Sequence, residues 1–121
     1  MADSCMCGEK PTLIFACSGG SDVGELSDRV ARKLGKEGKG KMYCLAGLGA
    51  GLSGMIETSR SAKELIVIDG CPVACGKKIL EKVGLPAQFI NLKDMGYEKG
   101  KTPCTEVTIN EVVTKLGGVK G

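Results

Sequence analysis

The sequence predicts a single α/β domain with a mostly parallel sheet of about four strands and helices on both faces, of Rossmann-like or flavodoxin-like type. Two observations lead to this expectation. Short apolar runs alternate with amphipathic helical patterns along the chain, as they do when crossover helices join parallel strands. The 121 residues also contain no linker long enough to separate two domains. We therefore expect one domain over residues 13–121, preceded by a flexible tail over residues 1–12.

The first βα unit has clear signals for a strand, a loop and a helix. An apolar run over 13–17 predicts the strand, and the loop 18–22 follows it. Ser21 or Asp22 can cap the next helix, and Asp22 with Glu25 has the spacing of a capping box. The apolar residues of this helix recur on one stripe, formed by Val23, Leu26, Val30 and Leu34.

The second unit is less regular. A strand is predicted over 42–46 and a glycine-rich loop over 47–51. A weaker helical pattern then runs through Met55, Ile56 and Ala62.

The remaining elements start with the clearest strand of the chain. Its continuous β-branched run over 65–69 suits burial on both faces of a sheet. The loop 70–75 leads into a helix that ends at Gly84, and a fourth strand follows over 87–92. The two helices of this half carry the apolar residues Ile79, Leu80 and Val83, and Ile109, Val112, Val113 and Leu116.

Composition argues against several classes of partner. The net charge is +3, the lysines are scattered among acidic residues, and only two Tyr and two Phe are present, so we expect no nucleic-acid partner. No run reaches the roughly 18 apolar residues that cross a membrane. The first residues also have neither the basic start nor the apolar run of a signal peptide. We therefore expect a cytoplasmic protein with no membrane partner and with reduced thiols.

Seven cysteines are many for packing alone, and their odd number argues against a complete disulfide framework. In a cytosolic protein such a number points to metal binding or redox chemistry. The chain has no histidine, so a metal site would use thiolates, carboxylates or backbone groups. One buried cysteine alone can act as a small hydrophobic residue, so the relative positions of the cysteines decide between these interpretations.

Three of the cysteines occupy equivalent places. Cys17, Cys44 and Cys71 are separated by two equal steps of 27 residues, and each lies at or near the end of a predicted strand. In a parallel sheet these strand ends share one edge, where neighbouring strands are about 4.8 Å apart and where open α/β sheets build their sites. Equal unit length explains part of this spacing, but it does not explain why the same turn holds cysteine each time.

Cys75 provides a fourth thiol. Pro72 suits the first turn of a helix, which would place Cys71 at the cap and Cys75 one turn later on the same side. The partial positive charge of a helix N-terminus favours thiolate, which is the form that binds metal. Four thiolates suit tetrahedral Zn²⁺. The predicted metal ligands are therefore Cys17, Cys44, Cys71 and Cys75.

Three stretches of the chain carry a resemblance to a known family: 15–32 (FACSGGSDVGELSDRVAR), 44–50 (CLAGLGA) and 68–75 (IDGCPVAC). Together they resemble the DGC-domain family, which is named for the tripeptide found here at 69–71 and is regarded as a family of candidate zinc-binding proteins of bacteria and archaea. The resemblance runs from about Leu13 to the final helix and implies zinc at the same four cysteines. It leaves open whether the metal serves structure, sensing or storage.

Two other functions stay open. The same cysteines could hold an iron–sulfur cluster or cycle between thiol and disulfide, because Cys₄ ligation serves both zinc and iron–sulfur chemistry. An enzyme could instead use Cys75 as a nucleophile at a helix N-terminus. The chain has no histidine and no obvious base, so we rank the enzyme last of the three and leave it open as an alternative.

Several further features have a functional and a plainer interpretation. Cys5 and Cys7 could cover the site or pass metal to it, and Cys104 could be a spare ligand, but passive thiols are the simpler expectation. The segment 49–54 fits G-x-G-x-x-G, a weak signal for nucleotide binding in a chain with 19 glycines. Asp69 could be catalytic, but we expect its carboxylate to accept N–H bonds and fix the turn that follows it.

Overall fold

The computed structural model describes residues 10–117, and within them lies one sheet of four strands. The strands are β1 (Thr12–Ala16), β2 (Lys41–Met42), β3 (Glu64–Asp69) and β4 (Gln88–Asn91). They pair in the order β2-β1-β3-β4, and every pairing is parallel. This confirms the predicted α/β class. The order is that of flavodoxin-like sheets rather than of the Rossmann type.

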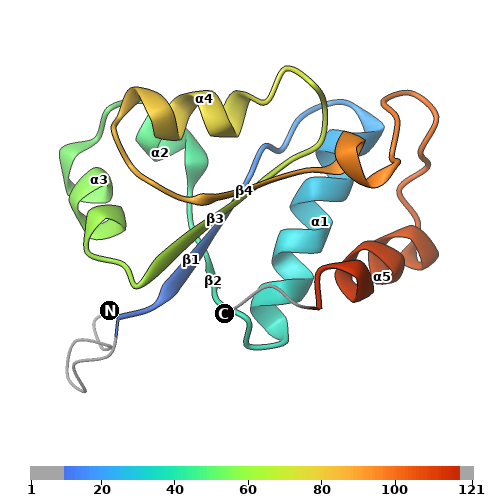
Figure 1. Cartoon of the computed structure of the whole chain (residues 1–121), viewed down its shortest axis with the longest axis horizontal. Coiled ribbons are helices and arrows are strands. Elements are labelled where there is room, and N and C mark those ends of the chain that lie inside the picture. Colours follow the sequence, from blue (N-terminus) through green and yellow to red (C-terminus); the bar gives the residue numbers. More distant parts are fainter. Residues whose placement is uncertain (1–9, 118–121) are drawn as a thin grey trace.

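Helices cover both faces of this sheet, as the alternating pattern predicted (Figure 1). One face packs against α1 (Asp22–Lys36), α5 (Glu106–Lys115) and the short 3₁₀ helix η2 (Leu92–Met95). The other face carries α2 (Leu45–Gly49), α3 (Ser53–Arg60) and α4 (Cys75–Lys82). The sheet therefore separates two apolar cores.

The two central strands, β1 and β3, are continuously apolar because helices cover both of their faces. Successive side chains of a strand point to opposite faces, so a strand with helices on both faces buries every residue. Ile14 and Ile66 enter the core on the α1 side, whereas Phe15 and Val67 enter the core on the α4 side. These four side chains are completely buried.

Helix α1 follows the predicted stripe but not the predicted capping box. Its N-cap is Ser21, whose hydroxyl accepts a hydrogen bond from the N–H of Gly24. The Asp22 carboxylate accepts the N–H group of Val23 and, from the distant loop before α5, those of Gly100 and Thr102. Asp22 therefore attaches that loop to the start of α1.

The second unit differs from its prediction. The expected strand over 42–46 is correct only at its start, because β2 ends at Met42 and α2 begins at Leu45. The predicted loop over 47–51 is largely this helix, which turns the side chain of Leu48 into the α4-side core. The weak helix is present as α3, although Ala62 lies beyond its end.

The start of the helix after β3 is also corrected. Cys71 is not its cap: α4 begins at Cys75, and Ala74 is its N-cap, with the left-handed φ of 55°. The residues from Cys71 to Ala74 form a turn in which the N–H of Ala74 donates to the carbonyl of Cys71, 3.1 Å away. Cys71 and Cys75 are therefore joined by a turn rather than by a helical step.

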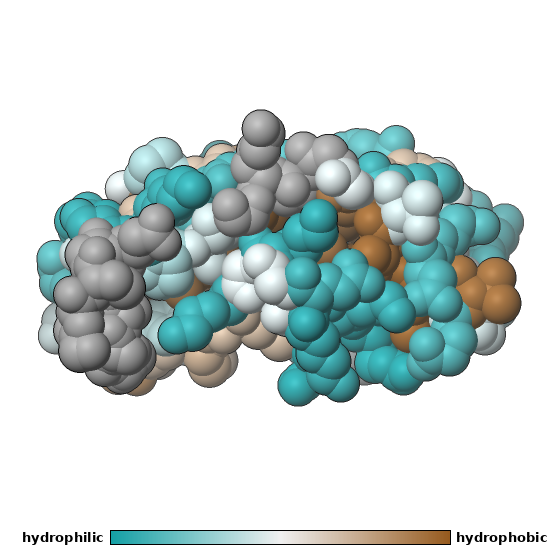
Figure 2. Space-filling view, turned by 90° about the horizontal axis from the view of Figure 1, so that it is seen from below, coloured by the Kyte–Doolittle hydropathy of each residue, from teal (hydrophilic) through white to brown (hydrophobic). Residues whose placement is uncertain are grey.

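Some expectations fall on residues 1–9 and 118–121, which are outside the described part of the chain. These include most of the predicted tail, with Cys5 and Cys7, and the end of the predicted domain; Thr12, at the tail boundary, belongs to β1. No helix within residues 10–117 combines the length and apolar character that a membrane crossing requires. The end of the molecule where the strands begin is largely hydrophilic, with an apolar hollow toward the α1 and α5 side (Figure 2).

Candidate metal centre

The four predicted ligands lie at the edge of the sheet where the strands end. Cys17 directly follows β1, Cys44 is the N-cap of α2 just after β2, and Cys71 follows β3 by two residues. Cys75 is the first residue of α4. Because β1 lies between β2 and β3, Cys17 has the β2 loop on one side and the β3 loop on the other.

This position is the switch point of the sheet. The chain leaves β1 toward α1 on one face and leaves β3 toward α4 on the opposite face (Figure 1). Open α/β sheets bind their ligands in the crevice that opens between two such strands. The β1–β3 pairing continues up to it, because the N–H of Cys17 donates to the carbonyl of Ile68 over 3.0 Å.

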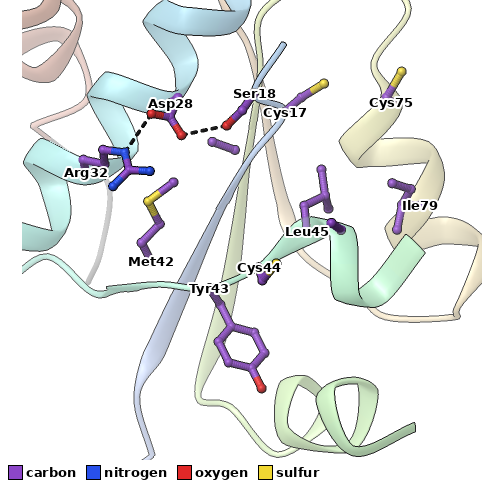
Figure 3. A pocket seen from close by; sticks show the side chains of 12 residues that line it. Cys17, Ser18, Asp28, Arg32, Met42, Tyr43, Cys44, Leu45, Cys75 and Ile79 are labelled. Carbon is purple, nitrogen blue, oxygen red and sulfur yellow. Dashed lines mark hydrogen bonds and ion pairs between the residues drawn. The ribbon is translucent and has the colours of Figure 1, made fainter. Parts of the chain in front are cut away.

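Two hollows meet at Cys17 and Cys75. The larger one, which we call the main cleft, has a volume of about 770 Å³ and is also lined by Cys44. The smaller one, of about 250 Å³, is also lined by Cys71. Figure 3 shows that the three cysteines of the main cleft come from separate elements around it. Cys17 and Cys75 thus line both hollows, whereas Cys44 lines only the main cleft and Cys71 only the smaller hollow.

The arrangement is open rather than closed. Within residues 10–117, no three or more cysteine, aspartate and glutamate side chains lie together at distances that could hold a metal ion. Cys44 and Cys75 are exposed, whereas Cys17 and Cys71 are half-buried. The donor set fits zinc, because it offers four thiols from three neighbouring loops. Ligation by all four would require the sulfur atoms to move closer together.

The pKa of Cys17 reflects burial and the acidic groups near its thiol. Its pKa is raised from 9.0 to about 11, first by burial, then by the negative charge of Asp69, and then by the charges of Cys75 and Cys71 and a hydrogen bond with Cys75. Alone, this thiol therefore stays protonated at neutral pH. A divalent cation would offset the repulsion between these groups through its positive charge. Metal binding would also remove the thiol protons.

Asp69 has the structural role that the sequence suggested. Its buried carboxylate accepts the N–H of Gly76 over 2.8 Å and the N–H of Lys77 over 3.0 Å. It thus satisfies the first turn of α4 from the end of β3. A side chain at Gly76 would clash with Asp69 and with Val67. The start of α4, and with it Cys75, is therefore fixed relative to the sheet.

Glycine is required at position 70 because any side chain there would clash with the backbone of α1. A Cβ atom there would overlap the carbonyl group of Val23, with the carbonyl carbon 2.6 Å away. The first turn of α1 thus packs directly on the backbone between Asp69 and Cys71. In this tripeptide, the aspartate accepts hydrogen bonds from the first turn of α4, and the glycine allows α1 to approach the backbone closely. The cysteine lines the smaller hollow.

Two features identified in the sequence lie outside this arrangement. Cys104 packs against the α1 and α5 core and lines neither hollow. The segment 49–54 runs from the end of α2 into α3, so its glycines do not form the strand-to-helix turn that holds a pyrophosphate.

One polar group in the main cleft was not predicted from the sequence. The Asp28 carboxylate accepts the Ser18 hydroxyl and the Nε–H of Arg32, each over 2.7 Å (Figure 3). Burial raises the pKa of Asp28, but the hydrogen bonds and positive charge of its partners outweigh this and lower it below 3.8. The four-residue spacing of Asp28 and Arg32 on a helix was the available signal, since such residues lie side by side.

The fold and the thiols at its switch point define a class of small α/β proteins with a cysteine-lined strand edge. The family model described as the DGC domain matches residues 13–116, so the chain belongs to the DGC-domain family. It is 32% identical over 88 residues to the "Anaerobic and virulence modulator AnvM" of Pseudomonas aeruginosa, covering 72% of this chain and 67% of that protein. No solved structure shows a significant match to this chain.

Proposed function

We propose that this chain is a cytoplasmic regulatory protein that holds one Zn²⁺ with Cys17, Cys44, Cys71 and Cys75. The observation that carries the proposal is the meeting of two thiol-lined hollows at Cys17 and Cys75. It accounts for cysteine after each of the first three strands. A bound cation would also explain why acidic groups gather around Cys17, because it stabilises all of them in the charged form.

The ligand loops differ in how firmly they are held. Cys17 continues the central ladder, and Asp69 fixes the first turn of α4. The carbonyl of Cys71 accepts the side-chain N–H of Asn91 over 3.0 Å, but the following turn includes Ala74 in a left-handed conformation, which costs about 1 kcal/mol for a residue other than glycine. Zinc would supply the positive charge that keeps the thiols deprotonated. We expect the Cys71–Ala74 turn and the Cys44 cap to make the closing movement.

A regulatory role follows from two considerations. AnvM is named as a modulator, and this chain shares 32% identity with it over 88 residues. The chain also has no histidine to act as a general acid or base near neutral pH. A site that joins three loops suits a protein whose surface changes when the metal binds or leaves.

The second candidate is redox function at the same thiols, as an iron–sulfur cluster or as a thiol/disulfide pair. The observation in its favour is that Cys17 and Cys75 both line the main cleft and the smaller hollow, so these two thiols are neighbours. Visible absorption separates the two metal candidates, because a protein with an iron–sulfur cluster is coloured and one with zinc is colourless.

The test is elemental analysis of protein purified without oxygen, as wild type and as four single Cys→Ser variants at positions 17, 44, 71 and 75. We expect about one zinc per wild-type chain and a clear loss of zinc in each variant. Cys104→Ser is the matched control and should keep its zinc, because Cys104 lines neither hollow. Full metal content in all four variants would refute the proposed site.

A further inference from the structure

Strand β4 forms one edge of the sheet, and within residues 10–117 it pairs with β3 alone. Flavodoxin-like sheets continue past this position with a fifth parallel strand. Here the chain leaves β4 through η2 and reaches α5, which packs on the α1 side instead. Figure 1 shows the molecule from this edge, with β4 in front of the other strands. One side of β4 is therefore open to a further strand.

The ladder identifies which backbone groups of β4 face outward. The N–H and C=O groups of one strand residue point to the same side. The carbonyl of Ile68 accepts the N–H of Cys17 in β1, so the backbone groups of Val67 point the other way, toward β4. Val67 is opposite Phe89, and in a parallel pair it bonds to the two residues that flank Phe89. Those two residues face β3, and the N–H and C=O of Phe89 face outward.

The side chain of Phe89 makes the same edge apolar. It lies on the α4 face of the sheet, because it is opposite Val67, whose side chain packs in the core on that side. Phe89 is 37% exposed, and the Nζ of Lys77 lies 5.7 Å from the centre of its ring. An open strand edge with an exposed aromatic side chain is a template for pairing with another chain.

The charges on α4 indicate which chain that is. Lys77 and Glu81 are one helical turn apart, so both lie on the side of α4 toward β4. Both are exposed, and neither makes an ion pair with another described residue. If a second copy pairs through β4 in the antiparallel direction, its α4 lies on the same face and runs the opposite way. Lys77 of each copy then faces Glu81 of the other, so the surface is complementary to itself.

The spacing of the two helices allows this contact. Helix α4 packs on β3, one strand in from the edge, since a side chain at Gly76 would clash with Val67. The β3 strands of two paired copies would be three strand spacings apart, about 14 Å. Helices at this separation leave a groove over β4 for the Phe89 rings, and long lysine and glutamate side chains can meet across it.

We propose that two copies of this chain associate through β4, with the strands antiparallel and the two Phe89 residues opposite each other. The product is one continuous eight-stranded sheet, four strands from each copy. Backbone hydrogen bonds and burial of the Phe89 ring supply the affinity. The exposed Lys77–Glu81 pairs add little energy but set the direction of pairing. The proposal is independent of the metal site.

The plainer interpretation is an edge that its short length and the nearby Lys77 protect against pairing. The two interpretations predict opposite effects of removing this lysine. A protected edge would associate more readily without it, whereas the proposed dimer would become weaker.

The test is sedimentation equilibrium of the full-length protein with a reductant present, because a disulfide through the exposed Cys44 or Cys75 would also link two chains. We expect a reversible monomer–dimer equilibrium with a dissociation constant in the micromolar range. Lys77→Glu and Glu81→Lys should each weaken association by about tenfold, because each places like charges together twice in the dimer. The double variant should restore association, and so should an equal mixture of the two single variants.

Lys82→Glu is the matched control. Lys82 is exposed on another side of α4, and its substitution makes the same change of charge as Lys77→Glu, so association should be unchanged. Net charge cannot produce the expected pattern, because Lys77→Glu lowers the net charge of +3 by two and Glu81→Lys raises it by two. Circular dichroism of each variant verifies that it is folded.

Four results would overturn the proposal. The first is a wild-type protein that stays monomeric up to about 1 mM, which is the outcome if the edge serves a strand of another protein. The second is a dimer that neither single variant weakens, and the third is equal weakening by Lys82→Glu or no association in the mixture. The fourth concerns hydrogen exchange: the N–H of Phe89 should be protected in the dimer, and fast exchange at high protein concentration would exclude pairing through β4.

Discussion

Replacement of Gly70 tests how the tripeptide at 69–71 joins the two helices of the site. A Cβ atom at this position would lie 2.6 Å from the carbonyl carbon of Val23, closer still to its oxygen, and 3.1 Å from the N–H nitrogen of Gly24. All three atoms belong to the backbone of α1, so no side-chain rotation can make room. In Gly70→Ala the first turn of α1 must therefore move away from the sheet.

The loss of stability in Gly70→Ala depends on the buried side chains that the start of α1 places in the core. Val23 and Leu26 are fully buried, and displacing them opens the core on the α1 side. Overpacking against rigid neighbours costs about 2–3 kcal/mol, which corresponds to a fall in the melting temperature of roughly 10 °C for a chain of this size. Thermal and urea unfolding followed by circular dichroism would measure it.

Gly54→Ala provides the control. Gly54 lies in α3, and a Cβ atom there would meet nothing within 4 Å. Alanine should leave stability unchanged or raise it by up to about 1 kcal/mol, because alanine favours helix more than glycine does. If Gly70→Ala were as stable as the wild type, the proposed close contact between α1 and the strand end would be wrong.

Three further predictions concern the same elements. Asp69→Asn should destabilise the fold by about 1–2 kcal/mol in urea unfolding, because an amide can accept only one of the two N–H bonds that start α4; unchanged stability would argue against this capping role. Hydrogen bonds from the N–H groups of Gly100 and Thr102 hold the pKa of Asp22 below 3.8, so its contribution is present above that pH and is lost as the pH falls through the lower folded value. Asp22→Asn should therefore make stability less dependent on pH below about pH 4, and an identical acid-unfolding curve would contradict this. Zn²⁺ at a hundred times its dissociation constant should raise the free energy of unfolding by about 2.7 kcal/mol in the wild type, with a smaller gain in Cys17→Ser; equal gains would place the metal elsewhere.

The central strands could be predicted from the sequence because burial on two faces leaves a plain signal. The strands predicted over 13–17 and 65–69 match β1 (Thr12–Ala16) and β3 (Glu64–Asp69) to within one residue at each end. The cysteines at the strand edge followed from the same logic, since the ends of parallel strands share one side of a sheet.

The β2 connection could not be predicted because its signal is ambiguous. Residues 42–46 are apolar enough for a strand, yet the edge strand β2 ends at Met42 and α2 begins at Leu45. The burial of Leu48 then favours a helical turn. The anchoring of Asp22 to Gly100 and Thr102 was equally out of reach, because it joins positions nearly eighty residues apart.

The proposed metal site has four sulfur ligands around one zinc ion. X-ray absorption at the zinc edge, on protein purified without oxygen, tests it most directly. We predict four sulfur neighbours at about 2.3 Å and no nitrogen or oxygen neighbour. A first shell containing nitrogen or oxygen, or fewer than four sulfur atoms, would contradict it.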